Sequence, residues 1–194
     1  MKIAMGDHEY NDTIGGITGG INQYLKPLNL QKTYYSFDMN NVDVIIIDSF
    51  TNYGTSSVQY QFIKNDLKTA SNNPNIDCIL VVESTPIYTS PSQHPGDSTI
   101  RDTYHPLFDK YGVDIVFTSD NHNYPRTFSL KYNGEDGDSS NPLIVDNNQD
   151  NYHFIDDNDG KKLKGIFYAN ELQLPHYHYV NYLNNVIDVQ RQLD

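Results

Sequence analysis

Val-Asp-Val-Ile-Ile-Ile-Asp, at residues 42–48, is the stretch that decides the fold of this sequence. Two further runs have the same character: Ile-Asp-Cys-Ile-Leu-Val-Val at 76–82 and Val-Asp-Ile-Val-Phe at 113–117. Their hydrophobicity is continuous rather than alternating, which is typical of strands covered on both faces in a parallel or mixed sheet. The sequence therefore predicts a sheet that lies between layers.

The segments between these runs have helical patterns. In residues 99–111 the apolar side chains recur at the spacing of one helical face. Residues 56–70 follow the same period less regularly, and Ser56 or Ser57 is suited to cap the start. Strands that alternate with helices predict an α/β layered fold.

Shorter elements are also expected along the chain. We predict a terminal strand at 3–5, a glycine-broken helix at 14–25, and a hairpin of 34–39 with 42–48 that turns at Asn40-Asn41. Residues 133–141 read as a loop, and 163–168 as a further strand. With 194 residues and no repeat or clear linker, we expect one domain over 1–194.

The composition excludes some classes of function. The formal net charge is −12, and an acidic surface repels the nucleic-acid backbone, so no nucleic-acid partner is expected. No apolar run reaches the roughly 18 residues that a membrane span needs. The first ten residues turn polar at Gly6 and do not resemble a signal peptide, so the compartment is left open.

Polar groups gather where the predicted strands end. These segments are 6–9 (Gly-Asp-His-Glu), 48–49 (Asp-Ser), 83–86 (Glu-Ser-Thr-Pro) and 119–123 (Ser-Asp-Asn-His-Asn). The carboxyl ends of strands in an open α/β sheet meet at one edge, and carboxylate with imidazole is a donor set for divalent metals. The same residue types also occur in ordinary turns.

The order of these segments resembles a known family. Residues 6–9 are similar to a Gly-Asn-His-Glu motif, and 59–67 to the helix that follows it. Residues 107–127 are similar to a segment that ends in Gly/Ser-His-Asn-His-Asn-Tyr-x-Arg-Thr. Over residues 3–133 the chain resembles the calcineurin-like metallophosphoesterases, in the branch of the purple acid phosphatases, whereas 134–194 diverge.

The resemblance implies a fold, a chemistry and a set of residue roles. The family fold is a layered β-sandwich flanked by helices in four layers (αββα), and its N-terminal strands would be missing here. The implied activity is phosphoester hydrolysis at two metal ions (iron, manganese or zinc), which activate a water and neutralise phosphoryl charge. Carried over by position, His8 assists catalysis and Asp7, Asp120 and His122 bind metal.

The sequence departs from the family pattern at several ligand positions. Ser84 stands where the family has a histidine ligand, Asp120 replaces the first histidine of a His-x-His pair, and Asp7 replaces an asparagine. A serine hydroxyl is a poor substitute for imidazole on a transition metal. Two upstream motifs of the family have no counterpart, although residues 6–10 also satisfy one of them, Gly-Asp-x-x-Tyr.

Two functions are therefore expected from the sequence. One is a phosphoester hydrolase whose activity is weakened or lost in this chain, with His94 or His105 as possible compensating ligands. The alternative is a non-catalytic binding or assembly protein that keeps the fold. If upstream strands are absent, an open sheet edge favours a homodimer or a partner chain. The substrate cannot be deduced from the sequence.

Overall fold

A computed structural model gives the arrangement of most of the first 146 residues. It describes residues 2–11, 13–14, 17–18, 20–89, 95–120, 127, 129–134, 137–146 and 167–169. These ranges include the three strand-forming runs and both long helices that the sequence predicts. His94, His122 and the rest of 121–126 lie outside them.

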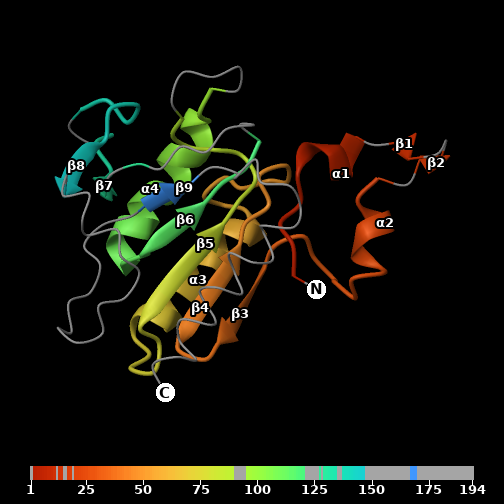
Figure 1. Cartoon of the computed structure of the whole chain (residues 1–194), viewed down its shortest axis with the longest axis horizontal. Coiled ribbons are helices and arrows are strands. Elements are labelled where there is room, and N and C mark those ends of the chain that lie inside the picture. The colour runs from red at the N-terminus through yellow and green to blue at the C-terminus, as the bar shows by residue number, and fades with distance from the viewer. Residues whose placement is uncertain are drawn as a thin grey trace, which may run out of the picture.

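The central sheet has five strands in the order β3-β4-β5-β6-β9 (Figure 1). The strands are β3 (Tyr35–Met39), β4 (Val42–Ile46), β5 (Cys78–Val82), β6 (Ile115–Phe117) and β9 (Phe167–Ala169). β3 and β4 form the predicted antiparallel hairpin, and the others follow in parallel register. Asn40 in the hairpin turn has a φ of 55°, which asparagine tolerates better than most residues.

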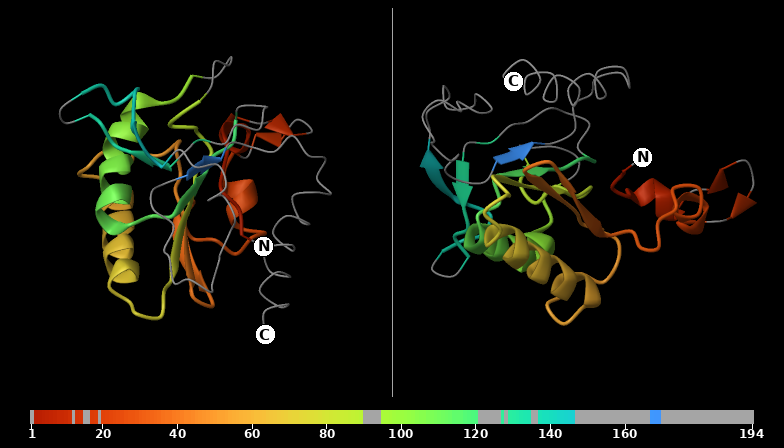
Figure 2. Two further views of the ribbon diagram at one scale, coloured as in Figure 1. Left: turned by 60° about the vertical axis from the view of Figure 1, so that its left-hand side comes forward. Right: turned by 90° about the horizontal axis from the view of Figure 1, so that it is seen from below.

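Two helices cover one face of this sheet (Figure 2, left). α3 (Val58–Ser71) begins after Ser57, whose hydroxyl accepts a hydrogen bond from the Tyr60 amide at 3.0 Å. α4 (Ser98–Tyr111) begins after Asp97, whose carboxylate accepts from two amides of the first turn. Because side-chain acceptors satisfy otherwise unpaired N–H groups, both starts are fixed locally.

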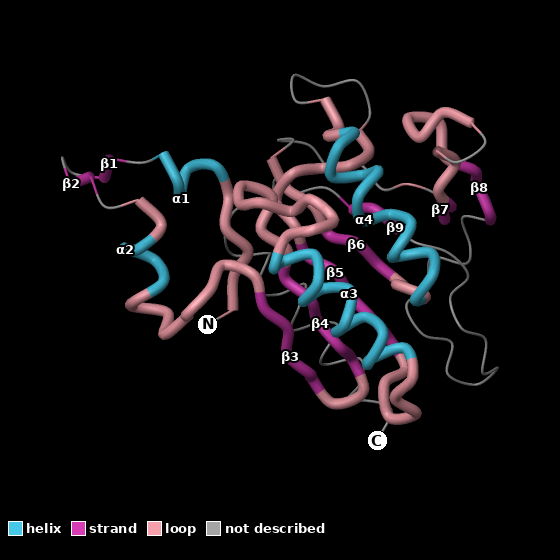
Figure 3. Tube along the Cα trace, turned by 180° about the vertical axis from the view of Figure 1, so that it is seen from behind, coloured by secondary structure: helices cyan, strands magenta, loops and turns pink. Residues whose placement is uncertain are grey.

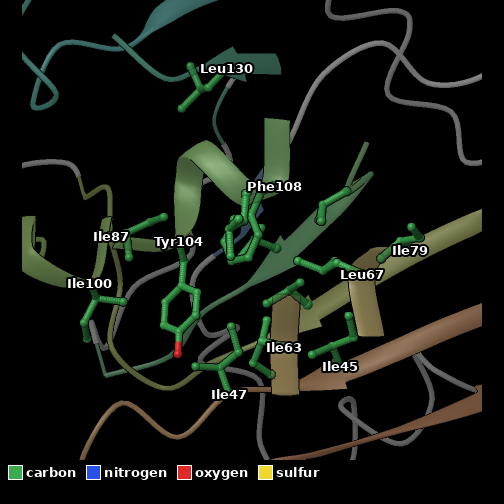
Figure 4. Packing of buried hydrophobic residues seen from close by; sticks show 14 of the residues in the cluster. Ile45, Ile47, Ile63, Leu67, Ile79, Ile87, Ile100, Tyr104, Phe108 and Leu130 are labelled. Atoms are coloured by element: carbon green, nitrogen blue, oxygen red, sulfur yellow. The ribbon is translucent and has the colours of Figure 1, made fainter. Parts of the chain in front are cut away.

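The core lies between the sheet and these helices (Figure 4). Ile45 and Ile47 from the β4 segment are fully buried against Ile63 and Leu67 of α3. From α4, Tyr104 and Phe108 join the cluster, and their rings stack at 6.0 Å. Burying one such side chain contributes roughly 1.5–3 kcal/mol, so this cluster fixes the helices on the sheet.

Short elements surround this unit. α1 (Asp7–Asn11), β1 (Thr13–Ile14), β2 (Ile17–Thr18) and α2 (Asn22–Leu25) lie beyond β3 at one side of the sheet (Figure 3). The predicted strand at 3–5 is absent, and the predicted helix at 14–25 is reduced to α2. Closely spaced glycines disfavour a continuous helix there, and Gly20 has a φ of +50°.

The ribbon of β7 (Ser129–Lys131) and β8 (Leu143–Asp146) was not predicted. Apart from the small ribbons, the described residues form one mixed sheet with one helical layer on it, so the α/β class is confirmed. A second large sheet and a second helical layer, which four layers require, are not among them. No helix within the described ranges is long and apolar enough to cross a membrane.

Candidate functional site

The segments that follow β4, β5 and β6 lie side by side at the carboxyl edge of the sheet. The Ile47 amide donates to the Val82 carbonyl at 2.9 Å, and the Glu83 amide donates to the Phe117 carbonyl at 2.9 Å. One residue farther on, the Ser119 amide donates to the Ser84 carbonyl at 3.0 Å. The sequence-based prediction that these segments converge is therefore confirmed by direct hydrogen bonds.

Asp48 is the polar anchor of this edge. It is fully buried, and Gln59 of α3 bonds to both its amide (2.8 Å) and its carbonyl (3.0 Å). Its carboxylate accepts from the Phe50 amide at 2.9 Å and from the Tyr10 hydroxyl. Burial, together with the Asp48 carboxylate, raises the pKa of Tyr10, which keeps the phenol protonated as a donor.

The Tyr10–Asp48 contact ties α1 to the strand ends. α1 also carries Asp7 and His8. At its first turn the Glu9 carboxylate accepts a hydrogen bond from the Gly6 amide at 2.7 Å. The sequence analysis located the Asp48 segment but missed the roles of Tyr10 and Gln59. Tyr10 ends the Gly-Asp-x-x-Tyr match at 6–10, which could have singled it out, whereas only long-range contacts reveal Gln59.

Ser84, at the family's histidine position, is buried. Its side-chain oxygen has no hydrogen-bond partner, and the residue is 4% exposed. The Ser84 carbonyl accepts hydrogen bonds from the amide of Ser119 and, at 3.2 Å, from its hydroxyl. The Thr85 amide donates to the Ser49 hydroxyl oxygen at 3.3 Å. The backbone of this strand end is therefore well fixed, although its side chain is a short neutral hydroxyl.

Glu83 is buried on the helical side of the sheet. Side chains alternate along β5, so Glu83 shares a face with Ile79 and Val81, which pack in the core below the helices. It is 1% exposed, and neither carboxylate oxygen has a hydrogen-bond partner. Burial raises the pKa of Glu83 well above its usual value, and the charge of Asp97 adds to the effect. Glu83 is therefore a core residue whose raised pKa favours the protonated form, and its side chain lies on the opposite face of the sheet from that of Ser84.

Asp120 follows the end of β6, at the position of the predicted metal ligand. Its backbone is left-handed, with a φ of 75°, which costs a non-glycine residue roughly 1–2 kcal/mol. Aspartate is one of the residues that visit this conformation. The structure thus places Asp120 at the same edge as Ser84 and Asp48.

The described residues do not make a metal centre by themselves. Across the described ranges, no three side chains of His, Cys, Asp or Glu are grouped closely enough to hold a metal ion. Asp7, His8 and Asp120 are described, whereas His122 lies outside those ranges. His105 is fully buried in α4, with Nδ1 2.8 Å from the Tyr88 hydroxyl and Nε2 3.4 Å from Asp109. It packs within the core rather than at the strand ends.

Known proteins with similar sequences point to one family. Purple acid phosphatase 18 of Arabidopsis thaliana is 35% identical over 114 residues, which is 58% of this chain and 25% of that protein. Fe(3+)-Zn(2+) purple acid phosphatase 12 of the same plant is 26% identical over 127 residues, 60% of this chain and 27% of the relative. This chain is a partial homologue of the purple acid phosphatases. No family model matches the sequence.

A solved structure supports the fold. Purple acid phosphatase PPD1 from yellow lupin (Lupinus luteus) seeds matches with a TM-score of 0.60 and 18% identity, over 86% of this chain and 30% of that one. The resemblance to the calcineurin-like metallophosphoesterases is thus confirmed for part of the chain, as is the α/β fold. The chain spans only about a quarter to a third of the length of these relatives.

Proposed function

We propose that this chain carries part of the centre of a metal-dependent phosphoester hydrolase, with activity weakened or lost in the chain alone. In this proposal Asp7, Asp120 and His122 bind metal, and His8 assists the transition state or the leaving group. The observation that carries it is the convergence of three strand-end segments at one sheet edge, to which the Tyr10–Asp48 hydrogen bond ties α1. Homology to purple acid phosphatases supports the reaction class.

The proposed cofactors are iron, zinc or manganese ions. One relative is named for Fe(3+) and Zn(2+), and we extend that chemistry to this chain as a proposal. When bound, such ions lower the pKa of a coordinated water and neutralise charge on the phosphoryl oxygens. The described residues supply too few grouped ligands, so we assign no catalytic step to a metal held by them.

The proposed cause of weak activity is the change of ligands. A buried serine hydroxyl replaces imidazole at position 84, and Asp120 replaces imidazole at the end of β6. Carboxylates favour harder ions, and each added negative charge makes the metal a weaker Lewis acid. These substitutions support lower affinity for transition metals together with slower hydrolysis.

The alternative function is a non-catalytic binding or assembly role for the same fold. It is favoured by the same two observations, the hydroxyl at Ser84 and the absence of a three-ligand group among the described residues. A partner chain that completes the centre belongs to the hydrolase proposal, whereas a homodimer or a partner that only covers the open sheet edge fits the alternative. Sedimentation at tens of micromolar checks self-association, because strictly monomeric behaviour counts against the homodimer.

Hydrolysis of an aryl phosphate by the metal-loaded chain tests the proposal. We expect slow turnover that falls roughly 10²–10⁴-fold in His8→Ala, since positioned proton transfer contributes about that much. Asp102→Asn is the control, because Asp102 lies on α4 with a half-exposed side chain and has no role in the proposal. Turnover that His8→Ala leaves unchanged would remove His8 from the proposal. No turnover above the metal-only rate would favour the non-catalytic role.

A further inference from the structure

Three aspartates meet where the β3–β4 hairpin packs on α3. Asp38 of β3 and Asp43 of β4 are directly paired across the strands, so both project to the same face of the sheet. Because side chains at every second position share a face, Asp43 points to the same side as Ile45 and Ile47, which pack against α3 in the core. On α3, Asp66 lies three residues after Ile63 and one before Leu67, on the side of the helix that faces the sheet.

Asp38 is exposed, whereas Asp43 and Asp66 each keep one buried carboxyl oxygen without a hydrogen-bond partner. Asp43 is 3% exposed, and its Oδ2 atom has no hydrogen-bond partner. The Oδ2 atom of Asp66 is also buried and without a partner. Like charges paired across two strands destabilise a sheet, and isolated buried carboxylates are more costly still. Neutralising Asp43, the most buried of the three, lowers the cost of this arrangement.

A proton can neutralise this cluster, because the charges that act on Asp43 are themselves carboxylates. The charges acting on Asp43 come from Asp66 and Asp38, and β5 contributes the apolar Ile79 opposite Asp43 in the parallel register. Burial first, and then these two carboxylates, raise the pKa of Asp43 to about 7. The pKa of Asp66 is raised mainly by burial, against the opposing effect of the Ser36 hydroxyl.

We propose that Asp38, Asp43 and Asp66 form a proton-dependent latch that holds the β3–β4 hairpin on α3 and loosens when the cluster loses its proton. A protonated Asp43 presents a neutral group to α3 and donates within the cluster. An ionised Asp43 places a buried negative charge beside the half-buried carboxylate of Asp66 at the hairpin–helix contact. The latch is independent of any phosphoesterase activity.

The direction of the effect follows from linkage. The folded state holds a proton on Asp43 that the unfolded chain releases near pH 4. The contribution of the latch to the free energy of unfolding is therefore fully present below that pH. Its contribution is lost as pH rises through about 7, the folded-state pKa. The transition therefore falls in the range where mild changes of pH alter the packing of the hairpin.

Hydrogen exchange of the full chain, read by segment at pH 5.5 and 8 and corrected for intrinsic exchange, tests this latch. We expect protection of residues 35–46 to fall about tenfold or more between these pH values, as one unit of pKa shift implies. Asp43→Asn, which keeps the shape and a donor without the charge, should abolish most of this change. If Asp43→Asn does not fold, Asp66→Asn on α3 should likewise abolish most of the change in protection.

Asp77→Asn is the matched control, because Asp77 is an exposed carboxylate beside the same hairpin and accepts a hydrogen bond from Asn41 at 2.7 Å. It should retain the wild-type pH response. Protection of 35–46 that is equal at both pH values would overturn the proposal. So would an equal pH response in wild type, Asp43→Asn and Asp66→Asn, or a response that Asp77→Asn removes as fully as they do.

Discussion

At the scale of single residues, the buried Glu83 shows what a strand-end motif does not reveal. The sequence places it beside Ser84, in a segment that delivers polar groups to the site. The structure turns its side chain to the opposite face of the sheet, where it lies near Tyr104, whose hydroxyl is also buried without a partner. Counting the alternation from Val81 would have given this direction, since the strand geometry continues one residue past β5.

Glu83 should make stability depend on pH. Its folded-state pKa is raised, so the stability it contributes is present below pH 4.5 and is lost as pH rises toward the folded value. Glu83→Leu removes two unpartnered oxygens at similar volume, and we expect the free energy of unfolding at pH 8 to rise by about 1–3 kcal/mol. Urea titrations at pH 5 and 8 measure this. A variant less stable than wild type at pH 8 would contradict the buried, neutral assignment.

At the scale of elements, the Tyr10–Asp48 hydrogen bond is one of the contacts that link α1 to the strand ends. Tyr10→Phe removes the donor to Asp48 while keeping the ring that lies 5.7 Å from Phe50. We expect a loss of about 1.5–3 kcal/mol, the range for hydrogen bonds to charged groups, and faster amide exchange in residues 7–11. Tyr24→Phe, on α2, is a matched loss of a hydroxyl. Unchanged exchange in α1 would show that other contacts hold it.

The end of α4 gives a second prediction for an element. Gly112 caps the helix with a φ of 71°, and its amide bonds to the Phe108 carbonyl. Gly112→Ala places a Cβ in open space, so the cost comes from the left-handed backbone alone, roughly 1–2 kcal/mol. Thermal unfolding should shift by a few degrees. An unchanged midpoint would mean that the chain relaxes out of this conformation at no cost.

Elements were predictable from sequence where the pattern is local and repeated. The apolar runs predicted β4, β5 and β6. Helical periodicity predicted α3 and α4, and Ser57 marked the start of α3. The strand at 3–5 was predicted wrongly, because a short apolar run forms a strand only if a partner strand is available. The β7–β8 ribbon was missed because its pairing includes a register shift that short, irregular sequence does not encode.

At the scale of the whole molecule, the sheet edge was predictable and the ligand geometry was not. Convergence of the strand ends follows from a parallel sheet, so the positions of Asp48, Ser84 and Asp120 could be inferred from the order of the runs. Which side chains face the same space depends on contacts between distant elements, such as Tyr10 with Asp48. The metal-ligand assignments for Asp7, Asp120 and His122 therefore stay predictions.

We propose that the altered ligands of this purple acid phosphatase homologue weaken metal binding. The most direct test is the metal content per chain after loading with iron, zinc or manganese and desalting, for wild type and Ser84→His. We predict fewer than two ions per wild-type chain, and a higher content in the variant, which restores an imidazole at the family position. Two tightly held ions in wild type, with no change in the variant, would contradict this account.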